Sequence, residues 1–544
     1  MGSLYALVTT LSTATAQVSM RRDATTQAAM EQAKAALIAW AALNPNRPGA
    51  LPCPDTNNDG LAEPPVGGAC PQYVGRLPWA TLGLPDLRDG AGELLWYALA
   101  QPFTNDPGAG AINSDTQGTL SVAGTAPAAN LIAIVFAPGP ALVGQDRSAA
   151  GVNNVANYLD GGNAVATTNF RSGRWCERGT ECPGGIPFND ELATITHAEL
   201  FNVVENVVAK RIQAEVVPQI QAHLALWGGA IGTPPSAATK GFYPFAAPFD
   251  DQSQLPTLPT DPSRSQNRYQ GLLGQTNGLL PVTRDNTTWM VWDNLSCQKV
   301  GGGFASQFQP PASPTDCAAT CSASATGLVC NFFYSGGGFC DDMNVRVSGR
   351  VRNVALSFAL PVSGQTASLS VSDSLTQQLE TAGGNPTGNL NVQYDVGLPH
   401  TCTPKNVVIT VPTPQFQAWT DATVVTNWFV RNRWYSQVYY AASPGYVPTA
   451  AIAAGAGGTC TVAGTPTCIT VSNWPATPTN DKRAILVLAG RNLAGGARTF
   501  TIANYFEGAN SVATPSYTTP APDYLFQWGL RSPVFNDKVV VVAP

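Results

Sequence analysis

The feature that most limits how this chain can fold is an uninterrupted helix-forming stretch over residues 4 to about 43. Apart from Gly2, no Gly or Pro occurs before Pro45, and from Thr25 onward the stretch is rich in Ala, Gln, Glu, Lys and Met, which favour helices. The pattern predicts one long helix that stops at the Asn-Pro-Asn-Arg-Pro sequence beginning at residue 44.

The two halves of this helix differ in composition. The second half places apolar side chains at helical spacing, a stripe that we expect to lie on a sheet: Ala29, Ala33, Ala36, Leu37 and Trp40. The first half begins with an apolar head at residues 4–8, and its only charges before Asp23 are Arg21 and Arg22. The apolar head is far shorter than the roughly 20 residues that cross a membrane. Two interpretations stay open: an amphipathic helix that caps a globular domain, or a helix with an apolar head and a tail that packs on a core.

Composition narrows the class of protein. A chain of 544 residues is too long for one core, so we expect two to four domains. The 52 Gly and 44 Pro indicate many turns and short strands. The net charge of -6, without a basic block, argues against nucleic acid as a partner. Twelve Cys against three His favour disulfides over zinc, as in a secreted or periplasmic protein.

A turn-rich loop follows the helix. Cys53 and Cys70 bracket it and are expected to pair. Within it, alternate oxygen-bearing side chains and Gly60 match the start of a calcium loop, with a possible ligand set of Asp55, Asn57, Asp59, Leu61 and Glu63. The twelfth position, where an EF-hand has Glu, is Val66. The alternative is an Asx-rich turn held by its own side chains and the disulfide.

The clearest internal signal is a recurring set of motifs. An apolar run over residues 131–136, which predicts a strand buried on both faces, has a counterpart at 484–488. Asn-Tyr-x-acid-Gly-x-Asn occurs around Asp160 and again around Glu507. Phe-Asn-Asp follows each at the same distance, with Phe188 after Asn163 and Phe535 after Asn510. Trp-Tyr-Ala at 96–98 corresponds to Tyr-Tyr-Ala at 439–441. The shared spacing predicts an internal duplication.

The duplication predicts a second helix ahead of a second sheet, and residues 194–227 fit it. Pro218 is expected to kink or interrupt this helix, and its many charges argue against a place in a membrane. One helical face is apolar: Leu200, Val203, Val204, Val207, Val208, Ile212 and Val216.

The remaining cysteines lie in loops and in a region that the first module lacks. Strands are expected at 345–347, 351–360, 367–371, 390–396 and 407–411, as a small β-sandwich or an elaborated sheet. Local disulfides are expected between Cys176 and Cys182, and between Cys460 and Cys468. Six further cysteines predict three disulfides of unknown connectivity in this inserted region: Cys297, Cys317, Cys321, Cys330, Cys340 and Cys402. An aromatic cluster at 332–334 suggests a surface ligand there.

The long helix, the Leu-Pro-Cys-Pro-Asp loop at 51–55, Gly-Arg-Leu-Pro-Trp at 75–79 and Trp-Tyr-Ala at 96–98 resemble the large type IV pilin-like proteins of Gram-negative bacteria, including minor pilins and type II secretion pseudopilins. One family hallmark, a leader ending in Gly followed by an apolar stretch with Glu near its start, does not occur in this sequence. The resemblance implies an α+β fold in which the helix packs on an antiparallel sheet, here duplicated and with an inserted disulfide-rich β region. It also implies assembly through the apolar head of the helix: Leu4, Tyr5, Leu7, Val8 and Leu11.

The resemblance further implies a structural subunit of a pilus-like or secretion-like filament, most simply a minor or tip subunit. Its partners would be other copies or other pilins, and the inner membrane before assembly, with the head in the periplasm or on an extracellular filament. The predicted parts are the helix (1–45), a first module (46–193), a second helix with its connection (194–285), the inserted β region (286–415) and a second sheet module (416–544).

No motif for catalysis emerges. The sequence has no G-x-S-x-G elbow, no H-E-x-x-H and no phosphate-binding Gly loop, so we predict that the protein is not an enzyme and uses no cofactor beyond possible calcium. The alternative to a filament subunit is a secreted or cell-surface adhesin that binds a glycan or protein through the inserted region.

Overall fold

The computed structural model describes residues 17–165, 167–176, 182, 187–221, 243–244, 246, 276–280, 427–443, 446, 468–495, 498, 501–512 and 525–544, and the backbone alone of 2–16, of 222–226 and of the strands between 289 and 411. The chain divides into two compact units. Unit 1 is Met1–Val208 with Ala494–Ala497, and unit 2 is Ala209–Leu493 with Arg498–Pro544.

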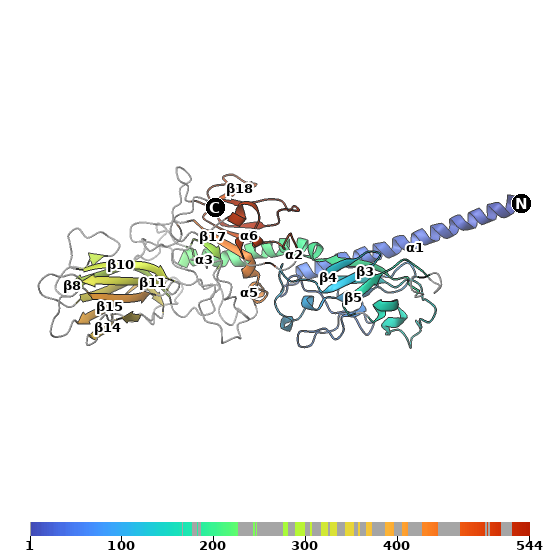
Figure 1. Ribbon diagram of the computed structural model, residues 1–544, viewed down its shortest axis with the longest axis horizontal. Coiled ribbons are helices and arrows are strands. Elements are labelled where there is room, and N and C mark those ends of the chain that lie inside the picture. Colours follow the sequence, from blue (N-terminus) through green and yellow to red (C-terminus); the bar gives the residue numbers. More distant parts are fainter. Residues whose placement is uncertain are drawn as a thin grey trace. The chain divides into compact units, whose positions relative to one another are not determined.

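Helix α1 (Gly2–Leu43) confirms the long N-terminal helix. Its second half lies on strands β4 and β6 of unit 1, while its first half runs on beyond the sheet (Figure 1). The buried stripe follows a spacing of three to four residues: Ala29, Met30, Ala33, Leu37 and Ala41. The predicted members Ala36 and Trp40 are only half-buried, at its edge. The chain turns away after Leu43 because Oδ1 of Asn44 accepts the backbone N–H groups of Asn46 and Arg47.

Unit 1 contains a six-stranded sheet in the order β1-β2-β4-β3-β5, with β6 also paired to β4. The central strand β4 is buried from Leu131 to Ala137, which confirms the strand predicted to be buried on both faces. All pairs are antiparallel except β3 with β5. The strands are β1 (Val74–Arg76), β2 (Trp96–Leu99), β3 (Leu120–Gly124), β4 (Ala128–Ala137), β5 (Asn169–Ser172) and β6 (Glu191–Thr196).

The predicted second helix exists but begins later, because residues 194–196 belong to β6. Thr196 and Glu199 form a reciprocal cap: the Glu199 carboxylate accepts the Thr196 N–H, and the Thr196 hydroxyl accepts the Glu199 N–H. The helix is α2 (His197–Arg211), a π-helical turn (Ile212–Val216) and α3 (Val217–Leu226). The wide turn directly before Pro218 is the predicted interruption. The predicted apolar face is wrong at Val203, which is 41% exposed, and Val207 is only half-buried.

Unit 2 contains a four-stranded antiparallel sheet in the order β21-β19-β17-β7, and α3 contacts its edge strand β21. This order matches β6-β4-β2-β1 of unit 1 strand for strand. A separate parallel pair, β18 with β20, corresponds to the parallel pair β3 with β5. The elements are β7 (Asn277–Leu279), α5 (Trp428–Arg431), β17 (Val438–Ala442), β18 (Thr470–Ser472), β19 (Ala484–Leu488), α6 (Ile502–Tyr505), β20 (Leu525–Gln527) and β21 (Lys538–Ala543).

Short 3-10 turns accompany these elements at Gln101–Phe103, Pro107–Ala109, Val155–Asn157, Gly161–Ala164, Trp434–Gln437 and Gly508–Val512. Side-chain oxygens of Asp106 and Asn154 cap two of them.

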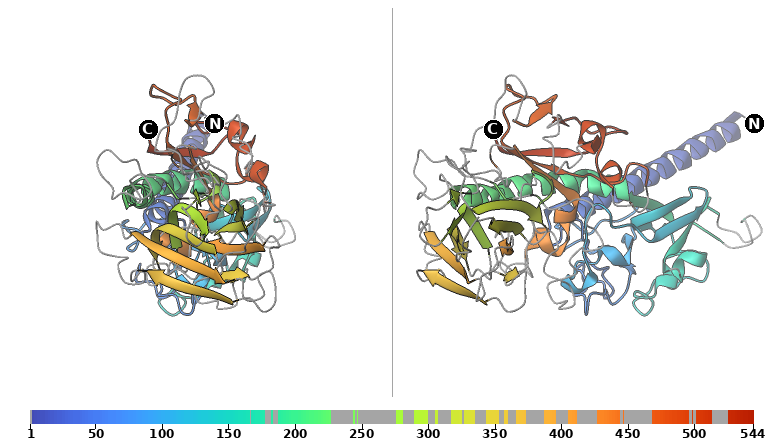
Figure 2. Two further views of the ribbon diagram at one scale, coloured as in Figure 1. Left: turned by 90° about the vertical axis from the view of Figure 1, so that its left-hand side faces the viewer. Right: turned by 60° about the vertical axis from the view of Figure 1, so that its left-hand side comes forward.

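The inserted region forms two antiparallel sheets, β10-β11-β16-β13 and β14-β15-β12-β8-β9 (Figure 2). The predicted strand over 351–360 is divided, because β12 ends at Arg352 and β13 covers only three residues. The strands are β8 (Trp289–Lys299), β9 (Ala305–Ser306), β10 (Cys317–Ser324), β11 (Gly327–Tyr334), β12 (Met343–Arg352), β13 (Ser357–Ala359), β14 (Thr366–Ser372), β15 (Thr387–Asp395) and β16 (Lys405–Val411).

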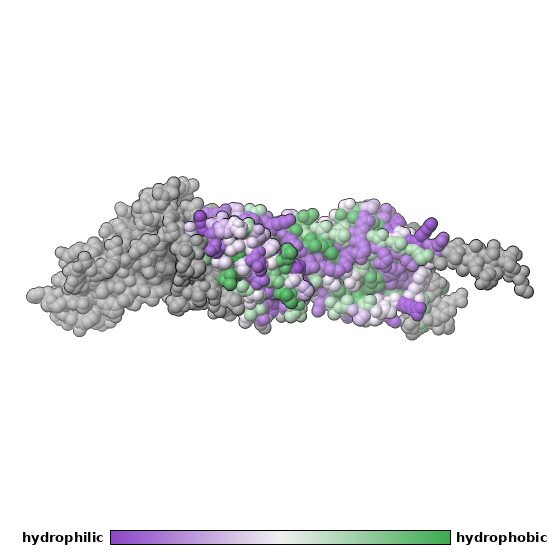
Figure 3. Space-filling view, turned by 90° about the horizontal axis from the view of Figure 1, so that it is seen from above, coloured by the Kyte–Doolittle hydropathy of each residue, from purple (hydrophilic) through white to green (hydrophobic). Residues whose placement is uncertain are grey.

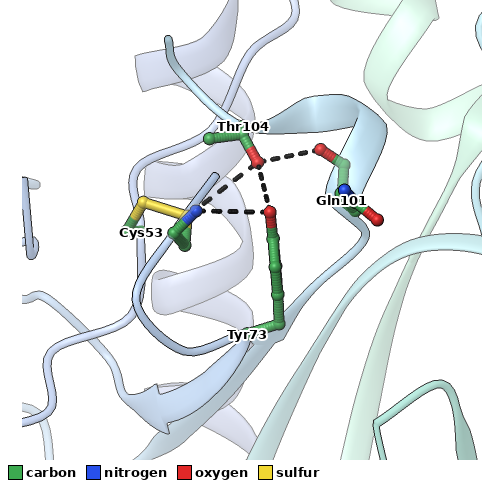
Figure 4. Close-up of a disulfide and its surroundings, with 5 residues drawn as sticks. Cys53, Tyr73, Gln101 and Thr104 are labelled. Carbon is green, nitrogen blue, oxygen red and sulfur yellow. Dashed lines mark hydrogen bonds between the residues drawn. A yellow bond between two sulfur atoms is a disulfide. The ribbon is translucent and has the colours of Figure 1, made fainter. Parts of the chain in front are cut away.

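Two predicted disulfides are confirmed, Cys53–Cys70 and Cys176–Cys182. The first is packed against a polar cluster in which the Cys70 N–H donates to the Tyr73 hydroxyl and the Thr104 hydroxyl donates to the Gln101 carbonyl (Figure 4). Cys468 is disulfide-bonded, while its predicted partner Cys460 lies outside the described residues.

The cysteines of the inserted region are described only in part. Cys297, Cys317, Cys321 and Cys330 lie on strands, and the register sets Cys321 opposite Cys330. Cys340 and Cys402 are outside the described residues, so the three predicted disulfides stay a prediction.

Candidate assembly helix and paired carboxyl sites

The candidate assembly surface is the part of α1 that precedes its buried stripe. Residues 17–25 are all exposed, and they include two large apolar side chains, Val18 at 52% and Met20 at 61%. The predicted assembly residues Leu4, Tyr5, Leu7, Val8 and Leu11 lie in the first three turns of α1, where the structure describes the backbone alone. Within the described chain, no helix has the length and apolar character needed to span a membrane. The visible described surface mixes hydrophilic and hydrophobic residues (Figure 3).

Helix α1 is fixed to its module by specific polar contacts. The hydroxyl of Thr26 accepts the Gly90 N–H at 2.9 Å and donates to the Arg22 carbonyl. A Cβ atom on Gly90 would lie 2.3 Å from that carbonyl oxygen, so only Gly allows this close approach. Further along, Lys34 Nζ forms a 2.7 Å ion pair with Glu199 of α2. The helix is therefore positioned on the sheet from residue 26 onward.

The predicted calcium loop satisfies its oxygens internally. The buried Asp55 carboxylate accepts the backbone N–H groups of Asn57, Asn58 and Gly60. Glu63 Oε1 accepts both the N–H and the hydroxyl of Thr56. In the part of the chain that the structure describes, no three His, Cys, Asp or Glu side chains converge as metal ligands. The geometry is that of the Asx turn, and calcium binding stays a prediction.

A second predicted feature, Asp160, belongs to a buried carboxyl site in unit 1. Asp160 precedes a 3-10 turn, and Asp190 lies directly before β6. Oδ2 of Asp190 accepts the Asp160 N–H and the Asn163 side-chain amide, each at 2.9 Å. Oδ2 of Asp160 accepts the Asn189 N–H at 2.6 Å, and the Asn189 side chain donates to the Pro140 carbonyl. The site joins the 160–163 turn, the turn after β4 and the entry to β6.

Unit 2 contains the same arrangement at the recurring motif. Oδ2 of Asp537 accepts the Glu507 N–H and the Asn510 side-chain amide, again at 2.9 Å each. Glu507 accepts the Asn536 N–H at 3.0 Å, and the Asn536 side chain donates to the Arg491 carbonyl. The two units also agree in the separations along the chain. The Asn and Asp joined through the side-chain amide are 27 residues apart in both. The turn acid and the Asn whose N–H it accepts are 29 residues apart in both.

An arginine occupies an equivalent position in each unit. Arg147 donates to the Gly139 carbonyl at 2.7 Å and lies 4.9 Å from the centre of the Tyr158 ring. Arg498 donates to the Gly490 carbonyl and lies 4.7 Å from the centre of the Tyr505 ring. In both units the Arg follows its Gly by eight residues.

Three of the buried carboxyl groups have pKa values above their usual range: those of Asp160, Asp190 and Asp537. Burial, together with the charge of Asp160, raises the pKa of Asp190 to about 8. Burial also raises the pKa of Asp160, against hydrogen bonds from Asn189, Asp190 and Gln145 and the charge of Arg147. In unit 2, burial and then the charge of Glu507 raise the pKa of Asp537 well above its usual value. The buried acids Asp160, Asp190 and Asp537 are at most 4% exposed, so these sites cross-link loops instead of opening to a substrate.

Sequence reasoning identified Asp160 and Glu507 as equivalent turn acids but missed their buried partners, Asp190 and Asp537. The sequence does contain a signal for these partners: the Phe-Asn-Asp motif that ends in each of them lies at the same distance from the turn acid in both copies. It also missed Trp175, which lies beside the confirmed Cys176 disulfide with 55% of its surface exposed. No family model matches the chain, and no curated protein or solved structure is similar to it.

Proposed function

We propose that this protein is a structural subunit of a type IV pilus-like or type II secretion-like filament and that it assembles through α1. The observation that carries the proposal is the division of α1 into two parts. The second part is seated on β4 and β6, and the first runs beyond the sheet and is exposed where its side chains are described (Figure 1). An apolar helical segment without a place in its own module is suited to pack against other helices.

We also propose that the two units arose by internal duplication of a pilin-like module, and their matching strand orders support this. Each unit has a helix on an edge strand, an antiparallel four-strand order, a parallel pair and a buried carboxyl site. A large head of this kind suits a minor or tip subunit, because bulky heads at every position would crowd a filament. The location would be the envelope of a Gram-negative bacterium, with the inner membrane as partner before assembly.

A second candidate function is a secreted or cell-surface binding protein. The observation in its favour is the inserted region, whose two sheets have no counterpart among the described strands of unit 1. This candidate does not need an apolar N-terminal segment, whereas the filament subunit does.

Deletion of residues 2–16 separates the two functions. A filament subunit loses assembly with its partners. The deletion leaves the buried stripe of α1, from Ala29 to Ala41, in place, so we expect the thermal midpoint to stay unchanged. A free-standing binding protein keeps full ligand binding after the same deletion. Co-sedimentation of wild type and deletion variant from envelope fractions, with the thermal midpoint as the folding control, distinguishes the outcomes.

A further inference from the structure

A cavity in unit 1 is lined in part by the exposed residues of α1 that precede its buried stripe. Its volume is about 420 Å³, within the range of roughly 300–1,000 Å³ that small-molecule sites occupy. Its lining comes from α1 residues between Val18 and Thr26, from the turns at 90–91 and 139–140, and from Trp175, Asn189 and Glu191. The lining is mostly apolar, with a few charged groups among it.

Trp175 is the unusual member of this lining. More than half of its surface is exposed, yet its backbone is fixed on the C-terminal side, where Cys176 and Phe188 exchange two hydrogen bonds of 2.8 Å and Cys176 is bonded to Cys182. An indole in the lining supplies apolar surface to a bound ligand, and with two side-chain torsions it loses little conformational entropy on binding.

The charges in the cavity have both signs. Arg22 supplies donors, and Asp23 supplies acceptors; among the described residues, neither side chain has a hydrogen bond or ion pair. Glu191 is a second acid, held through Oε2 by the Gln27 amide at 2.9 Å. A strongly anionic ligand would meet two carboxylates, and a cation would meet the guanidinium. The lining offers both donors and acceptors, which a neutral ligand with several hydroxyl groups can pair with.

We propose that this cavity binds a neutral saccharide, with a pyranose ring stacked on Trp175 and its hydroxyls bonded to Arg22, Asp23 and Glu191. A pyranose has the required chemistry, because its faces carry C–H groups that pack on an indole and its edge carries hydroxyls that donate and accept. The saccharide could come from free sugar or from a glycan on a surface. The proposal does not rest on the filament function, and the cavity shares Val18, Arg22 and Asp23 with the exposed segment of α1 that precedes the buried stripe.

The test is calorimetric titration of the full chain with the methyl pyranosides of glucose, galactose, mannose and N-acetylglucosamine, and in a second arm with glycans of the same sugars immobilised on a surface. We expect saturable binding of at least one sugar. Trp175→Ala should weaken it at least tenfold, and Arg22→Ala should weaken it as well. Trp474→Ala in unit 2, which removes a half-buried Trp that contacts Trp528, is the matched control and should leave binding unchanged.

The outcomes are separable from a folding defect, because Trp175→Phe keeps an aromatic face and should retain most of the binding that Trp175→Ala loses, at an equal thermal midpoint. Binding in both arms would indicate recognition of a single sugar unit, and binding in the immobilised arm alone would indicate a surface glycan. Absence of binding in both arms would overturn the proposal. Binding that Trp175→Ala leaves intact, or preferential binding of tetramethylammonium over the sugars, would also overturn it.

Discussion

The backbone N–H of Asp160 donates to Oδ2 of Asp190 over 2.9 Å, so the residue before β6 holds a turn that lies 30 residues earlier in the chain. The bond between Glu507 and Asp537 has the same length and the same separation of 30 residues. In each unit the carboxyl site connects three chain segments, so the recurring motifs have a structural role in holding these segments together.

The first prediction concerns pH and Asp190. Its pKa is raised to about 8 in the folded protein, against about 3.9 when unfolded. The stability that its neutral form contributes is therefore fully present below about pH 4 and is lost as the pH rises through about 8. Asp190→Asn stays neutral, so its free energy of unfolding should lack this decline. The difference in slope from wild type should approach about 1.4 kcal/mol per pH unit between these limits.

Chemical denaturation of both proteins from pH 5 to 9 measures this slope. Asp537→Asn serves as the counterpart in unit 2, where burial and the Glu507 charge raise the pKa in the same direction, and should show the same sign. Asp146→Asn is the matched control, because Asp146 is exposed and hydrogen bonds to Ser148 lower its pKa. Parallel slopes for wild type and Asp190→Asn would contradict the raised pKa of Asp190.

The second prediction tests how α1 is seated. Gly90→Ala places a methyl group against the Arg22 carbonyl, at a point where the backbone of one turn meets the backbone of the helix. Overpacking of this kind destabilises by about 1–3 kcal/mol. Gly162→Ala is the control, because a Cβ atom there has no neighbour within 4 Å. Thermal unfolding should distinguish the two variants, and equal midpoints would mean that the turn does not hold α1.

The third prediction concerns the Cys53–Cys70 disulfide, which closes a loop with a sequence separation of 17. Replacing both cysteines by Ala should lower the free energy of unfolding by about 3 kcal/mol, mainly through the greater entropy of the unfolded chain. Denaturation of the double variant and of wild type, each with and without reductant, gives the difference. A reductant effect on the double variant as large as that on wild type would assign the loss to the other disulfides.

The fourth prediction concerns the loop at 55–63. Asp55 accepts three backbone N–H groups while buried, so Asp55→Ala should destabilise by about 2 kcal/mol or more, to the same extent in calcium and in EDTA. Asp59→Ala, which removes an exposed carboxylate from the same loop, should have a smaller effect. A wild-type midpoint that rises by several degrees with calcium, and a loss of that rise in Asp55→Ala, would instead establish a calcium site.

How much of this fold the sequence predicts depends on the range of the interactions. The long helix, the buried strand β4 and the two confirmed disulfides follow from local spacing, and the structure agrees. The sequence pattern predicts a start of the second helix that is three residues early, because pairing with β4 draws residues 194–196 into β6. This is a tertiary effect that helix propensity does not include. The spacing of apolar residues also predicts that Val203 is buried, and the structure shows it exposed. Spacing identifies the apolar side chains of a helix, but it does not show which of them another element covers.

The candidate sites divide in the same way. Turn acids such as Asp160 and Asp55 are recognisable from Asx and Gly neighbours. The constant distance to the Phe-Asn-Asp motif marks Asp190 as well, but only the fold shows that it is buried and bonded to the 160–163 turn. The cavity beside α1 draws on five separate chain segments, so no local pattern marks Trp175 as part of its lining.

The measurement that tests the central proposal most directly is negative-stain electron microscopy of native, detergent-free material, combined with intact-mass analysis of the N-terminus. The filament proposal predicts filaments whose subunits begin with the apolar segment of α1, and their absence after deletion of residues 2–16. The contrary result is monodisperse particles of the wild-type chain, both alone at any concentration and after mixing with candidate pilin partners. That result would contradict the filament proposal and favour the free-standing binding protein.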